Sequence, residues 1–254
     1  MSTFNPTPEQ QRLIDKHRYI NVEHDWWDSV YEDSKQVCAA FGIDIDDISF
    51  SGFWSQGDGA CFTTQTSTLE EVMRRGHETM DAGTYGTDPD KFTGVLRAAW
   101  SFWYGIAQAL DAVRLTSPEG HEFCCAVEFR AERRHSMYSH SNTMALGGEF
   151  YGGDYPEFEE LAPSEDDLIA GLRHIANEIY DALEREHECQ TDDAQVWGTI
   201  VDNGLDSELE DDEDDDETNP NPNSHIPYST HDHLDPDGDS SQEQIDEETS
   251  LLPE

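Results

Sequence analysis

Residues 48–63 read ISFSGFWSQGDGACFT, and their pattern indicates the fold class. Apolar and polar side chains alternate in Ile48–Ser51 and again in Ala60–Thr63, which predicts two short β-strands. The glycines and the aspartate of Ser55–Gly59 separate these strands and are typical of a tight turn. We therefore expect an antiparallel β-hairpin over this stretch.

Helical spacing precedes the predicted hairpin. Apolar residues recur every three to four positions across residues 26–41, which predicts an amphipathic helix. Gly42 follows at the position where a left-handed cap would be needed. A shorter and more polar helix is expected to start after Thr7, because Pro8 would then lie in its first turn.

Three more helices are expected after the hairpin. Ser67 and Thr68 each have a glutamate three residues later, so a capping box in either register would start a helix over residues 69–81. The segment 91–115 is apolar on nearly every side between Arg97 and Asp111, which predicts a core helix covered all round by the fold. The last long helix carries one apolar stripe, made of Leu168, Leu172, Ile175, Ile179 and Leu183.

A second hairpin is expected between the last two helices. Residues 122–129 alternate in polarity, residues 131–134 would form a turn, and residues 137–146 would form a more polar partner strand. The predicted fold is therefore α+β. It consists of two antiparallel β-hairpins that form one small sheet packed against about five helices.

Charge divides the chain into two parts. The 57 acidic residues far outnumber the 14 Lys and Arg residues and give a net charge of −43. Residues 1–200 contribute −23 of this, while residues 201–254 contribute −20 and contain no base. Like charges repel and few apolar residues interrupt them, so we expect a folded domain over 1–205 and a disordered acidic tail over 206–254.

This charge restricts the classes of partner. A strongly negative surface repels phosphate backbones and anionic membranes, so direct binding to nucleic acid or lipid is not expected. The classes of partner that this charge allows are basic proteins, cations and neutral ligands. The chain has only three lysines, and its acid excess extends into the folded part, so adaptation to a salt-rich cytoplasm is an alternative explanation of the same composition.

Cysteine content and the N-terminus both bear on the compartment. The five cysteines form no CxxC pair and leave an odd number, which fits neither a disulfide framework nor a zinc site. The first ten residues contain no basic start followed by an apolar run, and the apolar, uncharged stretch Ala98–Leu110 is too short to span a bilayer. We expect a cytoplasmic protein.

The first group of candidate binding residues lies in the predicted turn. Trp54, Gln56 and Asp58, together with free backbone N–H groups, could hold a small polar ligand. The same residues would also make an ordinary hairpin turn, with Phe53 and Trp54 packed on the sheet.

The second group lies on the predicted strand over residues 137–146. Alternation would place Tyr138, His140 and Asn142 on one face, where a histidine could act as a general base or a metal ligand. A solvated sheet face is the alternative, because no carboxylate or cysteine stands at a diagnostic metal-binding spacing. The sequence assigns no catalytic residue, no metal ligand and no cofactor.

An acidic run near the start of the tail is a candidate protein-binding segment. It consists of Asp211, Asp212, Glu213, Asp214, Asp215 and Asp216. Such a run has a charge density like that of a nucleic-acid backbone, so it could occupy the basic groove of a DNA- or RNA-binding protein. Solubility and salt adaptation are the alternatives.

Three blocks of the sequence carry a family resemblance. They are INVEHDWWDSVYEDSKQV at 20–37, DDISFSGFWSQGDGACF at 46–62 and IYDALEREHECQTDDAQVWGTIVDNG at 179–204. Over roughly residues 18–204 the chain resembles a largely uncharacterised family of bacteriophage and prophage proteins that is sometimes labelled antitoxin-like. The resemblance implies a viral origin and an accessory role, and it transfers no catalytic residue.

Two functional hypotheses follow. The first is a non-enzymatic phage or prophage accessory protein that binds a basic host or viral protein, acting as an acidic nucleic-acid mimic in an anti-defence or antitoxin-like role. The alternative is a small-molecule or metal-dependent enzyme whose pocket lies between the 51–61 turn and the 138–142 strand. The enzyme hypothesis requires these two segments to lie together around a pocket, so their relative placement distinguishes the two hypotheses.

Overall fold

The computed structural model describes residues 4–117, 122, 124–134, 136–148 and 163–211, all within the first of two units, Met1–Asp212 and Glu213–Glu254. These residues form helices and two small antiparallel sheets, so the α+β class is confirmed. The elements are α1 (Pro8–Lys16), α2 (Asp28–Ala40), β1 (Ile45–Ser51), β2 (Gly59–Thr64), β3 (Ser67–Thr68), α3 (Leu69–Ala82), α4 (Gly94–Thr116), β4 (Glu128–Arg133), β5 (Met144–Gly147), α7 (Glu165–Gln190), α8 (Asp193–Asp202) and α9 (Glu208–Asp211).

The first hairpin is confirmed. β1 and β2 pair antiparallel, with Ile48 opposite Phe62 and Ser51 opposite Gly59. Nearly all of β2 is buried, because β1 lies along one edge while β4 and α7 pack against it from other sides.

The early helices are confirmed as well. Thr7 caps α1 in a reciprocal box with Gln10, and Gly42 takes a φ of 80° just after α2.

The second hairpin differs from the prediction. β4 continues through the expected turn at 131–134, and residues 122, 124 and 125 are helical rather than extended. The reason is visible in two adjacent cysteines: Cys124 and Cys125 are both buried, which one helical turn against the core allows and a strand with a single buried face does not. The predicted residues 123 and 135 lie outside the described part.

The expected strand over 137–146 is also shorter than predicted. Only Met144–Gly147 pairs with β4, and Ser141–Thr143 forms a 3₁₀ turn instead. The Nδ1 atom of His140 accepts a hydrogen bond from the Asn142 backbone N–H at 2.9 Å, and the Thr143 hydroxyl donates to the His140 carbonyl at 2.6 Å. These local bonds satisfy the backbone in a turn, so the strand begins only after them.

The strands form two sheets rather than the predicted one. β3 pairs with β4, and β4 pairs with β5, which makes a three-stranded sheet beside the β1–β2 pair. Where β2 meets β4, the Thr64 hydroxyl accepts a hydrogen bond from the Ala131 backbone N–H at 2.8 Å. The Thr64 hydroxyl thus takes the place of the backbone carbonyl that would accept this hydrogen bond if β2 and β4 were paired in one sheet. Of the two predicted registers of a capping box for α3, Thr68 is the observed N-cap, and its hydroxyl accepts a hydrogen bond from the Glu71 backbone N–H at 3.1 Å. The Glu71 carboxylate instead accepts hydrogen bonds from Arg74 and Arg75.

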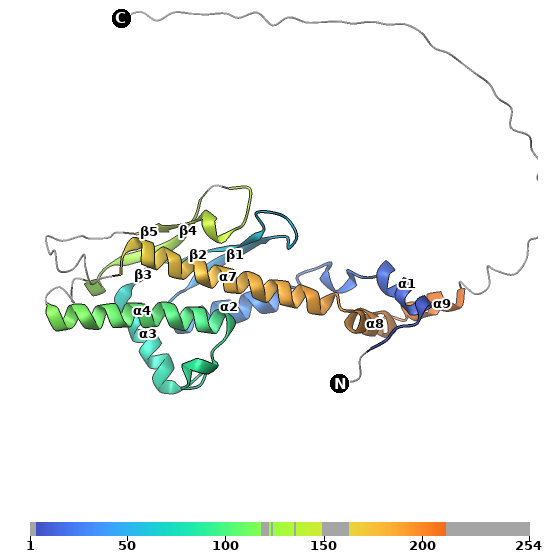
Figure 1. Ribbon diagram of the computed structural model, residues 1–254, viewed down its shortest axis with the longest axis horizontal. Helices are drawn as coiled ribbons and strands as arrows, with labels where there is room; N and C mark the ends of the chain where they lie inside the picture. The colour runs from blue at the N-terminus through green and yellow to red at the C-terminus, as the bar shows by residue number, and fades with distance from the viewer. Residues whose placement is uncertain (1–3, 118–121, 123, 135, 149–162, 212–254) are drawn as a thin grey trace, which may run out of the picture. The chain divides into compact units, whose positions relative to one another are not determined.

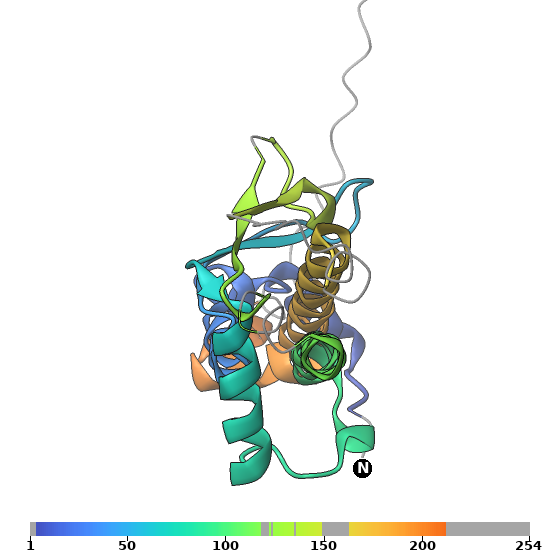
Figure 2. The same cartoon turned by 90° about the vertical axis from the view of Figure 1, so that its left-hand side faces the viewer.

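Two long helices form the centre of the core. Figure 2 shows α7 between the strands and α4, and Figure 1 shows α4 and α7 running side by side. The predicted apolar stripe of α7 is buried throughout. The expectation that α4 is covered all round is wrong, because Tyr104, Gly105 and Gln108 are exposed and Arg97 lies over the ring of Trp100 at 4.8 Å. None of the described helices combines the length and the apolarity that crossing a membrane requires.

A second, smaller apolar cluster lies where α1 and α8 meet. Its buried residues are Leu13, Ile14, Val196 and Ile200. Leu205 and Leu209 pack against it, so the described fold continues past Leu205 to the end of α9, and the Lys16 ammonium pairs with Glu208 at 2.6 Å. Figure 1 shows α1, α8 and α9 gathered near the C-terminal end of α7. Helix α8 was not predicted.

Candidate functional site

A cluster of aromatic rings gathers where the turn of the first hairpin meets α7. We call it the aromatic cluster. It consists of Trp26, Trp27, Phe50, Phe53, Trp54, Tyr180 and His187. These residues come from the segment just before α2, from β1 and its turn, and from the C-terminal half of α7. Three segments far apart in the sequence therefore build one surface.

The turn is fixed by its own aspartate. One carboxylate oxygen of Asp58 accepts hydrogen bonds from the backbone N–H groups of Trp54 at 2.9 Å and Ser55 at 2.6 Å. Gly57 takes a φ of 101°, a left-handed conformation that favours glycine. The turn geometry therefore uses the carboxylate of Asp58, whereas Gln56 is exposed and makes no hydrogen bond within the described residues.

Phe53 and His187 form the base of the cluster, and Trp54 forms its outer part. The Phe53 ring lies 5.1 Å from His187 and 5.5 Å from Tyr180, centroid to centroid. The Tyr180 hydroxyl donates to the Gly52 carbonyl at 3.1 Å, which ties α7 to the turn. Trp54 contacts His187 edge-on at 5.3 Å, yet 78% of it is exposed. A large ring is thus presented to solvent on a rigid base.

Acidic groups surround this surface. Burial raises the pKa of Tyr180, and the nearby carboxylates of Asp58, Glu184 and Asp181 raise it further. Burial lowers the pKa of His187, while Glu188 opposes that shift. A neutral imidazole among aromatic rings, with carboxylates around it, favours cationic partners, because both the ring faces and the carboxylates attract positive charge.

The second group of predicted residues lies next to the turn. A Cβ added at Gly59 would lie 2.8 Å from Cδ2 of His140, and one at Gly57 would lie 3.8 Å from Tyr138. The Ser51 hydroxyl donates to the Ser139 carbonyl at 3.1 Å. The structure therefore places the segment of the second group beside the hairpin turn, through Ser51, Gly57 and Gly59 of the hairpin. Residues 138–142 lie there as a bend and a 3₁₀ turn, not as the strand that the enzyme hypothesis assumed.

Hydrogen bonding within these turns limits their chemistry. Nδ1 of His140 and the backbone N–H of Asn142 bond each other, and the Asp58 carboxylate caps its own turn. Within the described part of the chain, no group of three or more His, Cys, Asp or Glu residues is arranged to hold a metal ion. Asp211 ends α9, and the remaining acidic candidates, 212–216, lie outside the described residues.

Sequence reasoning missed several residues of the site. The spacing of residues 26–41 predicts only a helix around Trp26, and no sequence pattern singles out Tyr180 or His187. The two α7 residues are seven apart and so share a helix face. That spacing was the available signal, but it does not reveal that this face meets the hairpin turn.

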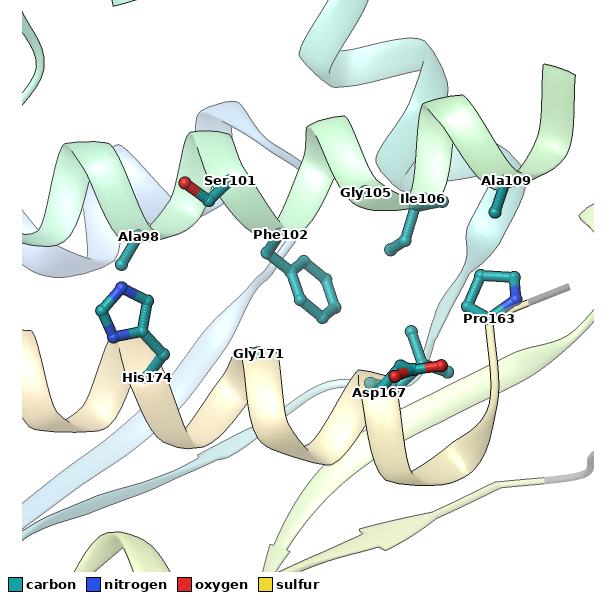
Figure 3. A pocket seen from close by; sticks show the side chains of 11 residues that line it. Ala98, Ser101, Phe102, Gly105, Ile106, Ala109, Pro163, Asp167, Gly171 and His174 are labelled. Carbon is teal, nitrogen blue, oxygen red and sulfur yellow. The ribbon is translucent and has the colours of Figure 1, made fainter. Parts of the chain in front are cut away.

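A groove lies between α4 and α7. Its volume is about 450 Å³. Figure 3 shows the ring of Phe102 reaching from α4 toward α7, with His174 at one end of the groove and Pro163 and Asp167 at the other. Ser101 and Gly105 line the α4 side. In the sequence, the one hint of this groove is Gly105, a glycine inside the predicted helix over residues 91–115.

A family model described as a domain of unknown function, DUF8835, matches residues 26–193, about two thirds of the chain. The chain belongs to the DUF8835 family. Comparisons with curated proteins and with solved structures give no match.

The limits of the DUF8835 domain coincide with a structural division. All seven residues of the aromatic cluster and every residue lining the groove lie within 26–193. The four buried residues of the second apolar cluster lie outside that range, on α1 and α8. Both candidate sites are therefore features of the DUF8835 domain itself.

The lowered pKa of His187 predicts a pH-dependent stability. The unfolded chain binds a proton more readily than the folded chain, so the folded state loses stability as pH falls below about 6.5 and continues to lose it down to the folded pKa. We expect wild type to lose stability relative to His187→Phe between about pH 7.5 and about pH 5.5. Urea unfolding of both proteins measures this difference, and a constant gap across that range would contradict it.

Proposed function

We propose that this chain is a non-enzymatic, protein-binding module that docks a basic partner protein on the aromatic cluster. The observation that carries the proposal is Trp54, a ring 78% exposed that rests on Phe53 and His187. Tryptophan is enriched among residues that dominate binding energy at protein interfaces. A tryptophan side chain has only two rotatable χ angles, so its ordering on binding costs little conformational freedom and most of its burial would contribute to affinity.

The carboxylates near the aromatic cluster favour a basic partner. Asp181 and Glu188 are exposed, while Glu184 and Asp58 are partly exposed around the rings. An arginine or lysine side chain can stack on Trp54 while its charge faces these carboxylates. The chain's net charge of −43 would also speed association with a positively charged protein.

The setting that we propose is a phage or prophage accessory role in the host cytoplasm, of the anti-defence or antitoxin-like kind. Its support is the resemblance carried by the blocks at 20–37, 46–62 and 179–204. In that setting the acidic run at 211–216 would add nucleic-acid mimicry, because a basic groove built for phosphates also attracts a dense row of carboxylates.

A crosslinking experiment tests the proposal. A photo-crosslinking amino acid is placed at position 54 of the full-length chain in its host, and in a matched control at position 19, because Tyr19 is 59% exposed and lies outside the aromatic cluster. We expect an adduct with a basic protein at position 54 and not at position 19. The captured protein is then purified, and its affinity is measured from about 50 mM to about 500 mM NaCl.

The salt series distinguishes docking on this surface from other binding. A basic partner held by carboxylates should bind much more weakly at the higher salt concentration, because ions screen exposed charges. The proposal fails if position 54 yields no adduct beyond that of position 19. It also fails if the captured protein is acidic, or if its affinity does not change with salt.

A further inference from the structure

The groove between α4 and α7 is separate from the aromatic cluster, and the proposed docking makes no use of it. Its volume of about 450 Å³ falls within the range of small-molecule sites. Phe102, Ile106 and Leu168 give it an apolar floor. Gly171 allows that floor to form, since a Cβ at this position would lie 2.5 Å from Cδ2 of Phe102.

Gly105 leaves space in the groove because it has no side chain, and the packing of α4 does not require a glycine at this position. It lies inside α4, where glycine is less favourable than alanine, and its φ is not in the left-handed region. Among the described residues, a Cβ added there would have no heavy atom within 4 Å. In this part of the chain, neither a turn nor a close neighbour explains the glycine. A ligand that lies against the helix backbone would explain it, because any larger side chain would fill the space.

Polar groups stand at the two ends of the groove. Ser101 and His174 line it, and their side chains make no hydrogen bond within the described residues. At the other end the Asp167 carboxylate accepts hydrogen bonds from the hydroxyl and backbone N–H of Ser164, which lower its pKa and keep it ionised. His174 and Asp167 are seven residues apart on one helix, which corresponds to about 10 Å along the axis.

The charge of the lining selects the sign of the ligand. Asp167 is the one lining residue with a carboxylate, and the lining, as far as the structure describes it, contains no lysine or arginine. Residues 1–200 carry a net charge of −23, so an anionic ligand would be repelled before it reached the groove.

We propose that this groove binds a small amphiphilic organic cation. Its flat apolar body lies over Phe102 and the backbone at Gly105, and its ammonium group pairs with Asp167. A hydrogen-bonding group at the far end of the ligand reaches Ser101 or His174. The α4–α7 groove is thus a small-molecule site within the DUF8835 domain, independent of the hairpin surface.

Tryptamine and indole-3-propionate form a matched pair of probes, because they share a ring and differ in the sign of their charge. Titration of the full-length protein is followed by backbone amide NMR shifts, which also locate the binding. We expect tryptamine to shift the amides of Gly105 and Gly171 and to bind at least tenfold more tightly than the anion. If tryptamine gives no saturable shift of these amides, or if the two probes bind equally, the proposal is overturned.

Two leucine substitutions separate binding in the groove from general attraction to an acidic protein. Gly105→Leu fills the groove and is expected to weaken tryptamine binding at least tenfold. Gly198→Leu is the control, since Gly198 lies in α8 and also has open space around its missing Cβ. Circular dichroism checks that both variants fold. Wild-type affinity in Gly105→Leu, or an equal loss in both variants, would show that the groove is not the site.

Discussion

Gly76→Ala is expected to lower the free energy of unfolding by about 3 kcal/mol, because it overpacks the core. A Cβ at Gly76 would overlap Cδ1 and Nε1 of Trp103. Trp103 cannot easily move away. It is buried, its Nε1 donates to the Met73 carbonyl at 3.2 Å, and its ring contacts Phe41 at 6.0 Å. Relief would require α3 and α4 to separate or the indole to lose its hydrogen bond.

Urea unfolding followed by far-UV circular dichroism measures this loss. The matched control is Gly198→Ala, because Gly198 also lies in a helix but has no heavy atom near the added methyl group. The control should gain about 0.5 to 1 kcal/mol, since alanine is the better helix former. A loss below about 1 kcal/mol in Gly76→Ala would mean that α3 and α4 are not packed as closely as the structure shows.

Trp54→Ala is expected to weaken binding of the captured basic partner about 30-fold, or about 2 kcal/mol, the range typical of an interface hot spot. The stability of the free protein should hardly change, because the ring is mostly exposed and its base of Phe53 and His187 remains in place. A binding loss without a stability loss is the expected signature of an interface residue.

Isothermal titration calorimetry with the purified partner gives the affinity, and urea unfolding gives the stability. Tyr19→Ala is the control, because Tyr19 is an exposed aromatic outside the DUF8835 domain. Equal affinities for wild type and Trp54→Ala would remove the aromatic cluster from the interface. A stability loss as large as the binding loss would mean that Trp54 acts on the fold instead.

The sequence predicts the first hairpin and the long helices because their signals are local. Each of these signals lies within a short window of sequence and matches the structure: the alternation of apolar and polar residues at 48–51, the turn residues at 55–59 and the apolar stripe of α7. Residues 122–129 show where that approach fails. Apolar and polar residues do alternate there, but Cys124 and Cys125 are both buried and lie in a helical turn. Only tertiary packing decides between a strand and a helical turn for such a segment.

The candidate site was predictable only in part, for a similar reason. Trp54 and Asp58 were identified from turn chemistry, which is local. Tyr180 and His187 join them only because α7 crosses the hairpin turn: the Tyr180 to Gly52 hydrogen bond spans 128 residues of sequence. The groove depends on how α4 and α7 pack, so its one sequence signal was a glycine inside a helical pattern.

The second apolar cluster has a consequence for the order of events during synthesis. Leu13 and Ile14 are synthesised long before Val196 and Ile200, the residues that cover them. Lys16 and Glu208 are separated by 192 residues. At ordinary translation rates that separation corresponds to about 10 to 40 s. Throughout this interval α8 is absent, so the apolar side chains of α1 stay uncovered and accessible to chaperones.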